Sequence, residues 1–227
     1  MAAIMESAQE EATNGASPIT CLFVDIGEVL LTDGWDHNAR KLAAETFKLD
    51  RAEMESRHRL TFDTYEEGKL TLEDYLGHVV FCEDRPFTRA EFWRFMCAQS
   101  KPYPEMIQLV KQLKARHGLK VAVVSNEARE LNAYRIKTFE LDRVVDSFIS
   151  SCFVHIRKPD PDIFRLAMDI TQTPAEQAVF IDDMPMFVQI AESLGIRSIH
   201  HTDYRSTCVK LASFGLRHDG GDVHETC

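Results

Sequence analysis

The alternation of short apolar runs with helical stretches is the feature that most constrains what this chain can fold into. Runs rich in strand-forming residues lie at 19–24, 119–124, 147–150, 178–181 and 196–200. Helical patterns lie between or beside them at 104–116, 128–138, 160–171 and from 183 to 194. Strands that alternate with helices form right-handed crossover units, so the sequence predicts an α/β fold built on a doubly wound parallel sheet.

Residues 34–100 have a different sequence pattern from the rest of the chain. They are rich in charged residues, have helical periodicity and contain no strand-like run. Helices are expected at 37–48, 51–67, 71–81 and 88–98. Two pairs have the spacing of capping boxes, Thr71 with Asp74 and Thr88 with Glu91. A small core for this segment is expected from Leu42, Phe47, Met54, Leu60, Phe62, Leu72, Tyr75, Phe92, Trp93 and Phe95. The expected organisation is a core domain at 19–33 and 101–227 with a helical insert at 34–100.

Charge and composition limit the classes of partner and the location of the protein. The formal net charge of −10 disfavours nucleic acid and anionic membranes as partners. No apolar run approaches the length of a membrane span, and residues 1–18 are polar, so they are expected to be a disordered lead-in and not a secretory signal. The six cysteines form no C-x-x-C pair, which favours free thiols and a cytoplasmic location.

Polar residues follow three of the apolar runs at the point where each run ends. Asp25, Ser125 and the pair Asp182-Asp183 occupy these positions. The carboxyl ends of parallel strands open on one crevice, so these side chains are expected to converge there. Three neighbouring carboxylates repel one another unless a cation lies between them, and hard oxygen ligands suit Mg²⁺.

This set of residues is suited to phosphoryl transfer, which needs mainly positioning and charge neutralisation. Asp25 is the expected nucleophile towards the phosphorus of a bound monoester. Ser125 and nearby backbone N–H groups can hold phosphoryl oxygens. Lys158, just before a predicted helix, can neutralise both the phosphate and the aspartate.

Four segments resemble, in order, the four motifs of the haloacid dehalogenase-like hydrolase superfamily. They are 22–30 around Asp25, 123–126 with Ser125 and Asn126, 158–164 beginning at Lys158, and 180–183 with the Asp pair. The resemblance covers roughly residues 19 to 213. It implies a Rossmann-like core in which the helical insert forms a cap that closes over the substrate.

The resemblance also implies a role for each matching residue. It makes Asp25 the nucleophile, Ser125 and Asn126 substrate-binding residues, and Lys158 the charge-neutralising residue. The implied Mg²⁺ ligands are Asp25, the backbone carbonyl of Gly27 and Asp182, with Asp183 coordinating through water.

Gly27 departs from the superfamily pattern, in which phosphatases usually carry a second Asp two residues after the nucleophile. That Asp acts as general acid and base, a contribution typically worth about 10²–10⁴-fold in rate. Three interpretations remain open. The substrate has a good leaving group, or a neighbour (Glu28, Asp33, Asp36 or His37) supplies the proton, or the protein has become slow or only binds phosphate.

The expected function is Mg²⁺-dependent hydrolysis of a small phosphorylated metabolite, with a sugar phosphate as one candidate, through an aspartyl-phosphate intermediate. One alternative is a metal-independent 2-haloacid dehalogenase, since that branch also lacks the second Asp, although its fourth motif typically lacks the Asp182-Asp183 pair. The other is a non-catalytic phosphate-binding or regulatory protein on the same fold. The sequence predicts no oligomeric state.

Overall fold

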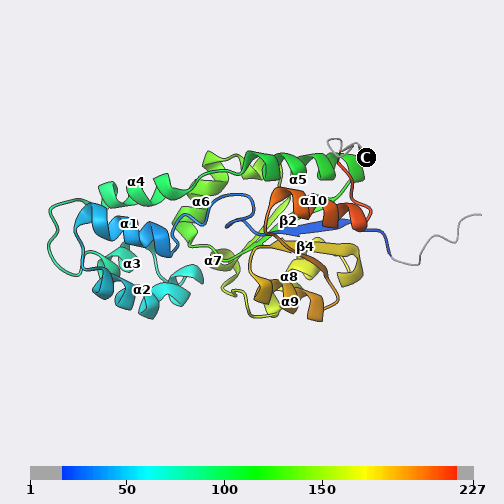
Figure 1. Ribbon diagram of the computed structural model, residues 1–227. Helices are drawn as coiled ribbons and strands as arrows, with labels where there is room; N and C mark the ends of the chain where they lie inside the picture. Colours follow the sequence, from blue (N-terminus) through cyan, green and yellow to red (C-terminus); the bar gives the residue numbers. More distant parts are fainter. Residues whose placement is uncertain (1–16, 219–227) are drawn as a thin grey trace, which may run out of the picture.

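A five-stranded parallel sheet forms the centre of the computed structural model, which describes residues 17–218 (Figure 1). The strand order is β3-β2-β1-β4-β5. The strands are β1 (Cys21–Val24), β2 (Lys120–Ser125), β3 (Ser147–Ser150), β4 (Ala178–Asp182) and β5 (Arg197–His200). This order reverses at β1, so the crevice beyond β1 lies between the two halves of the sheet.

Helices cover both faces of the sheet. They are α5 (Pro104–His117), α6 (Arg129–Thr138), α8 (Asp162–Thr171), α9 (Pro185–Ser193) and α10 (Tyr204–Ser213), with short turns α7 (Ser151–Val154), η1 (Leu141–Arg143) and η2 (Ala175–Gln177). In Figure 1, α5 and α10 lie above the sheet and α8 and α9 below it. The predicted α/β fold with a doubly wound parallel sheet is confirmed.

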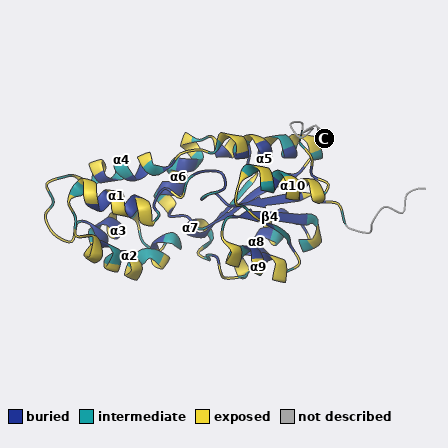
Figure 2. Cartoon of the chain, in the orientation of Figure 1, coloured by how far each residue is buried: buried dark blue, intermediate teal, exposed yellow. Residues whose placement is uncertain are grey.

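Alternation along β1 explains why one strand supports two cores. Leu22 and Val24 pack under α5 and α10, whereas Cys21 and Phe23 pack against α8 and α9. Successive side chains of a strand point to opposite faces, so a strand covered on both faces reads as a continuous apolar run. All four residues are fully buried, as the dark strands of Figure 2 show.

Helix α10 and the short turns were not predicted from the sequence. Asp203 caps α10 by accepting a hydrogen bond from the backbone N–H of Ser206. Only Thr207 and Leu211 of this helix are buried, so its apolar periodicity is weak. Leu211 packs into the core below α5, and this tertiary contact stabilises the helix. The local sequence pattern alone does not predict it.

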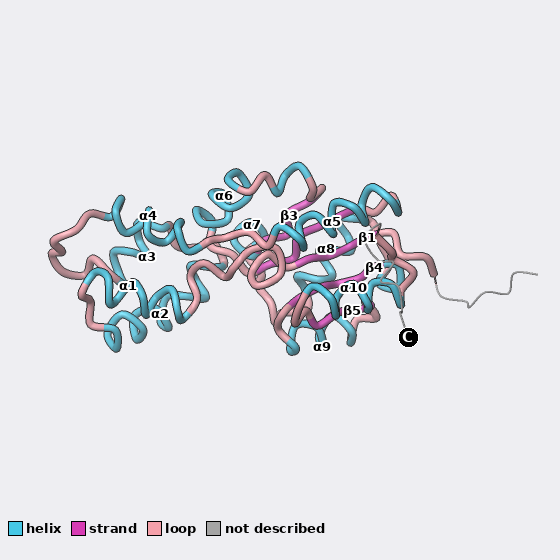
Figure 3. The backbone as a smooth tube through the Cα atoms, turned by 45° about the horizontal axis from the view of Figure 1, so that its top comes forward, coloured by secondary structure: helices cyan, strands magenta, loops and turns pink. Residues whose placement is uncertain are grey.

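A second group of helices extends from one end of the sheet, as Figures 1 and 3 show. It comprises α1 (His37–Phe47), α2 (Arg51–Glu66), α3 (Leu72–Val79) and α4 (Arg89–Gln99), hereafter the helical lobe. The structure contains both predicted capping boxes, Thr71 with Asp74 and Thr88 with Glu91. Among residues 17–218, no helix has the length and apolar character needed to cross a membrane. The predicted disordered stretch 1–18 falls mostly outside the described residues.

The helical lobe has a hydrophobic cluster of its own, and most of the expected side chains contribute to it. Three expectations are wrong, because Leu42 is 45% exposed, Leu60 is 82% exposed and Phe62 is not part of the cluster. These helices carry more apolar residues than they have inward-facing positions. Composition alone does not show which face of each helix is covered. The cluster is instead completed by Trp35, Tyr65 and small alanines of α1. The expected residues found in or against it are Phe47, Met54, Leu72, Tyr75, Phe92, Trp93 and Phe95.

A buried hydrogen-bonded chain links three elements of the lobe. Trp35 Nε1 donates to Tyr75 Oη at 2.8 Å, and Tyr75 Oη lies 2.8 Å from His58 Nδ1. An indole N–H only donates, so the Tyr75 hydroxyl hydrogen is free to be donated to a neutral imidazole. Burial, with the nearby Arg40 guanidinium, lowers the pKa of His58 to about 4.

We expect this histidine to make the lobe acid-sensitive. The folded-state pKa lies below that of an exposed histidine, so the unfolded chain binds the proton more tightly and stability falls as the pH falls from about 6.5 to about 4. Between about pH 7.5 and about pH 5, wild type should lose about 2 kcal/mol of unfolding free energy more than His58→Gln, which has no titrating ring. Denaturant unfolding of both proteins at the two pH values measures this, and equal losses would contradict it.

Candidate active site

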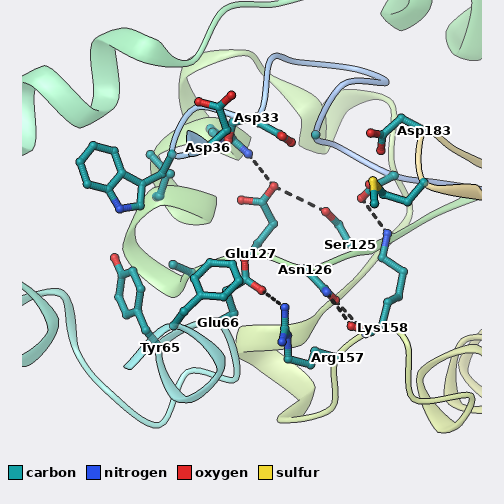
Figure 4. A pocket seen from close by; sticks show the side chains of 18 of the residues that line it. Asp33, Asp36, Tyr65, Glu66, Ser125, Asn126, Glu127, Arg157, Lys158 and Asp183 are labelled. Atoms are coloured by element: carbon teal, nitrogen blue, oxygen red, sulfur yellow. Dashed lines mark hydrogen bonds and ion pairs between the residues drawn. The ribbon is translucent and has the colours of Figure 1, made fainter. Parts of the chain in front are cut away.

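The polar residues predicted at the strand ends lie around one cavity of about 260 Å³ between the sheet and the helical lobe (Figure 4). Asp25 follows β1, Ser125 ends β2 and Asp182 ends β4. The cavity is lined by Asp25, Gly27, Ser125, Asn126, Lys158 and Asp183, and Asp182 lies buried beside it. The structure thus brings together all seven residues expected at the site.

Asp25 is fixed where β1 gives way to a tight turn. Its backbone N–H donates to Ile181 O, which continues the pairing of β1 with β4, and its Oδ1 accepts from the N–H of Ile26 at 2.9 Å. The residue is 7% exposed. Its carboxylate is therefore held in one orientation and reached from the cavity alone.

Lys158 lies between two of the carboxylates. Its Nζ is 2.5 Å from Asp182 Oδ2 and 3.2 Å from Asp25 Oδ1. Burial opposes the charge of this ammonium, but Asp25 and Asp182 outweigh burial and raise the pKa of Lys158. The side chain consequently stays positive inside the protein, at the place where a transferred phosphoryl group would add negative charge.

Asn126 holds Lys158 in place. Its Nδ2 donates to the carbonyl of Lys158, and its Oδ1 accepts from the N–H of Lys158, both at 2.8 Å. Both polar atoms of the Asn126 side-chain amide are thus hydrogen-bonded to the backbone of Lys158. The structure gives Asn126 a positioning contact in addition to its place on the cavity wall.

Three carboxylates form a cluster that could hold a metal ion. Oxygen atoms of Asp25, Asp182 and Asp183 all lie within 4.8 Å of one another. Burial and the charge of Asp25 raise the pKa of Asp182 to about 7 and that of Asp183 to about 6. A divalent cation at this point would relieve that repulsion, so the donor set fits Mg²⁺.

The two members of the Asp pair differ in their contacts. Asp182 Oδ2 accepts from Lys158, and its Oδ1 accepts from the N–H of Met184 at 2.8 Å. Asp183 lines the cavity, whereas Asp182 is fully buried. This placement favours Asp183 for direct contact with a cation, whereas the motif resemblance gives that role to Asp182.

The space beside Gly27 is occupied by the side chain of Asp33. A Cβ atom placed on Gly27 would lie 2.3 Å from Asp33 Oδ1, closer than any van der Waals contact. Solvent reaches Asp33, but protein surrounds much of its carboxyl group. This burial, with the charges of Glu28 and Asp25, raises the pKa of Asp33 to about 6. A carboxyl group with a raised pKa therefore lies where the side chain of residue 27 would otherwise be.

The backbone of Asp33 is fixed from two sides. Its N–H donates to Glu28 Oε1 at 3.1 Å, and its carbonyl accepts from Arg135 Nη2. Glu28 itself adopts a positive φ of 50°, and its other oxygen accepts from the Tyr103 hydroxyl at 2.9 Å. The turn after β1 thus holds the Asp33 side chain towards Gly27.

The other three candidates for the missing acid have different contacts. Glu28 is bound to Tyr103 and to the Asp33 backbone, as above. Asp36 caps α1, because its Oδ1 accepts from the N–H of Ala39 at 2.7 Å. His37 is exposed and contacts Arg51 and Glu55. Of the four, Asp33 is the one that meets the space of residue 27.

Sequence reasoning missed a buried ion pair behind the site. Arg135 Nη1 lies 2.6 Å from Glu127 Oε1, and both residues are nearly inaccessible to solvent. Arg135 also binds Ser100 Oγ and the carbonyl of Thr32, so it contacts both connections to the helical lobe. A charged residue within a helix is typical of an exposed face, so the sequence offered no clear sign of this pair.

Two known proteins with similar sequences can be compared with this chain. A putative pyrophosphatase, PpaX, from Caldanaerobacter subterraneus subsp. tengcongensis is 30% identical over 57% of this chain and 69% of its own. An (S)-2-haloacid dehalogenase 4A from Burkholderia cepacia is 34% identical over 35% of this chain and 34% of its own.

The fold also matches a solved structure. A HAD family enzyme from Bacteroides thetaiotaomicron, crystallised as a magnesium complex, superposes with a TM-score of 0.70 at 19% identity over 82% of this chain and 94% of its own. The family model of the haloacid dehalogenase-like hydrolases matches residues 19–195. This chain belongs to the haloacid dehalogenase-like hydrolase family.

Proposed function

We propose that the protein is a Mg²⁺-dependent phosphatase that hydrolyses a small phosphorylated metabolite, with Asp25 as nucleophile. The observation that carries this proposal is the contact of Lys158 with Asp25 and Asp182, next to the third carboxylate of Asp183. A buried cation and a metal-suited acidic cluster around one nucleophile supply the charge neutralisation that phosphoryl transfer requires. The putative pyrophosphatase among the relatives supports phosphoryl chemistry. The helical segment 34–100 would act as the cap.

The metal would be held by Asp25, Asp183 and the carbonyl of Gly27, with Asp182 next to it. When bound, Mg²⁺ would neutralise charge on the phosphoryl oxygens and on the carboxylates. Ser125, at the end of β2, would bind a phosphoryl oxygen through its hydroxyl group. Lys158 would balance the remaining charge.

The proton transfers can be assigned to Asp33. An Asp25 oxygen attacks the phosphorus and the bond to the leaving oxygen breaks, while protonated Asp33 gives its proton to that oxygen and releases an alcohol. Asp33, now a carboxylate, takes a proton from water, whose oxygen attacks the phosphorus of the aspartyl-phosphate. The bond to Asp25 breaks, phosphate leaves, and both carboxyl groups return to their starting states.

Two other functions remain to be tested against this proposal. A metal-independent dehalogenase is suggested by the relative from Burkholderia cepacia. Against it stands the Asp182-Asp183 pair, since two raised pKa values beside Asp25 indicate a place for a cation that halide displacement does not use. In a non-catalytic phosphate-binding protein, Lys158 and the acidic cluster would still bind phosphate and metal. Such a protein would not need Asp33 as an acid or a base.

The discriminating experiment is a substrate panel with and without metal. We expect phosphate release from p-nitrophenyl phosphate and acetyl phosphate with Mg²⁺, and loss of that activity with EDTA. Chloride release from 2-chloropropionate in the presence of EDTA would establish the dehalogenase instead. Metal binding without turnover of any phosphate ester would leave only the binding function. The proposed partner is a small phosphorylated molecule, and no nucleic acid is expected to bind. The cytoplasmic location stays a prediction.

A further inference from the structure

The part of the cavity that would receive the leaving group is lined by carboxylates and apolar side chains. Lys158 lines the part that would receive the phosphoryl group. The leaving-group part is formed by the helical lobe and by residues of α6, α9 and the segment before α8. Resting on the proposed phosphatase function, we infer that the leaving group is a compact, uncharged alcohol with an apolar face. A substrate with a second anionic group, such as a carboxylate or a further phosphate, is excluded.

The guanidinium groups that line the cavity already have partners. Arg40 binds both oxygens of Glu55, at 2.9 and 3.2 Å, and the carbonyl of Trp35. Arg157 binds Asp63 and Glu66 through its two terminal nitrogens, and its Nε, which has no partner among the described residues, is buried out of reach of solvent. The third is Arg135, whose terminal nitrogens bind Glu127 and two backbone carbonyls. A second substrate anion would have to displace a carboxylate from one of these groups, and the exchange gains little.

Carboxylates line the same region and would repel such an anion. Asp36 and Glu66 both reach the cavity, in addition to Asp33 near the reacting centre. Burial, which outweighs the attraction of Arg157, raises the pKa of Glu66 to about 7. A negative charge is therefore already costly at this point, and a substrate carboxylate next to Glu66 would meet both the burial penalty and the repulsion.

The walls instead offer apolar surface. Trp35, Phe62 and Tyr65 line the cavity from the lobe, and Phe187 lines it from α9. The hydroxyl of Tyr65 is buried and has no hydrogen-bond partner among the described residues. Figure 4 shows Tyr65 on the lobe side of the cavity, beside Glu66. A hydroxyl buried to this degree is out of reach from the cavity, so Tyr65 adds to the apolar wall against which the leaving group would pack.

The size of the cavity limits the leaving group further. Its volume of about 260 Å³ must hold the phosphoryl group as well. Ligand cavities for drug-sized molecules run from about 300 to about 1,000 Å³, so this cavity favours a short leaving group over a nucleoside or a long chain. A short alcohol with hydroxyl or carbonyl groups does fit.

The test is a pair of substrates that differ only in charge. We expect kcat/KM for glycolamide phosphate to exceed that for phosphoglycolate by roughly 10–100-fold, because the amide avoids both the burial of a charge and its repulsion by the lining carboxylates. Acetyl phosphate serves as the reference substrate for the proposed function. Equal rates, or a preference for phosphoglycolate, would overturn the inference.

Variants of two adjacent glutamates connect the preference to the site. Glu66→Gln removes the repelling carboxylate and frees one nitrogen of Arg157, so the preference for the amide should shrink severalfold. Glu67→Gln, whose side chain contacts Lys69 outside the cavity, should keep the wild-type ratio. An unchanged ratio in a folded Glu66→Gln protein would overturn the role of Glu66. Turnover of acetyl phosphate alone would overturn the alcohol class while the phosphatase function stands, and no turnover of any substrate would overturn both.

Discussion

Asp25→Asn is expected to reduce Mg²⁺-dependent phosphate release by at least about 10³-fold, since an amide oxygen does not form the acyl-phosphate bond. Asn keeps the size of the side chain and a carbonyl oxygen that can accept the hydrogen bond from the N–H of Ile26. The change therefore removes the nucleophilic charge with little change in shape. Initial rates on acetyl phosphate and p-nitrophenyl phosphate measure the effect.

Thermal stability is the control for this variant. Asp25 raises the pKa values of both Asp182 and Asp183, so removal of its charge relieves repulsion in the metal-free protein. Lys158 keeps Asp182 as a partner. The Tm of Asp25→Asn without metal should therefore equal or exceed that of wild type. A variant that folds and retains the wild-type rate would contradict the role of Asp25.

Asp33→Asn is expected to lower steady-state turnover by about 10²–10⁴-fold, because Asp33 is the side chain nearest to the space beside Gly27 among residues 17–218 and general acid–base help is typically of this size. The two half-reactions should respond differently. A substrate with a good leaving group needs no proton in the first step, so the variant should release one equivalent of leaving group quickly and then stall. Rapid-mixing measurement of p-nitrophenolate shows this burst.

Two further variants test whether Asp33 acts through its position. Asp50→Asn changes an aspartate that caps α2 outside the cavity, and it should keep the wild-type rate. The double variant Asp33→Gly with Gly27→Asp moves the carboxyl to the other side of the same space and should recover part of the lost rate. Gly27→Asp alone places two carboxyl groups where one fits. A wild-type rate in Asp33→Asn would show that the proton comes from elsewhere.

The main elements of the fold could be predicted because the three central strands, β1, β2 and β4, are buried on both faces. Such strands are continuous apolar runs, and Asp25, Ser125 and Asp182 stand out as the polar residues that end them. The order of these runs along the chain then places the three residues in one crevice. The positions of Asp25, Ser125 and Asp182 depend on the order of the strands in the sheet. The alternation of strands and helices along the sequence predicts a sheet of this kind.

The parts that were missed depend on tertiary contacts. Helix α10 has weak periodicity and is stabilised by packing of Leu211. Leu60 is exposed although Met54 and Tyr65 of the same helix are buried, since tertiary partners decide which face of a helix is covered. The contact of Asp33 with the Gly27 space depends on a turn fixed by Glu28 and Arg135, which lie far apart in sequence. No local pattern connects such residues.

The most direct test of the mechanism is chemical capture of the intermediate. Asp33→Asn would be mixed with p-nitrophenyl phosphate and Mg²⁺, quenched in acid within the burst, digested and analysed by mass spectrometry. We expect one phosphoryl group on the peptide that contains Asp25, and none in Asp25→Asn treated in the same way. A burst without protein-bound phosphoryl, or a phosphoryl group on another residue, would contradict attack by Asp25.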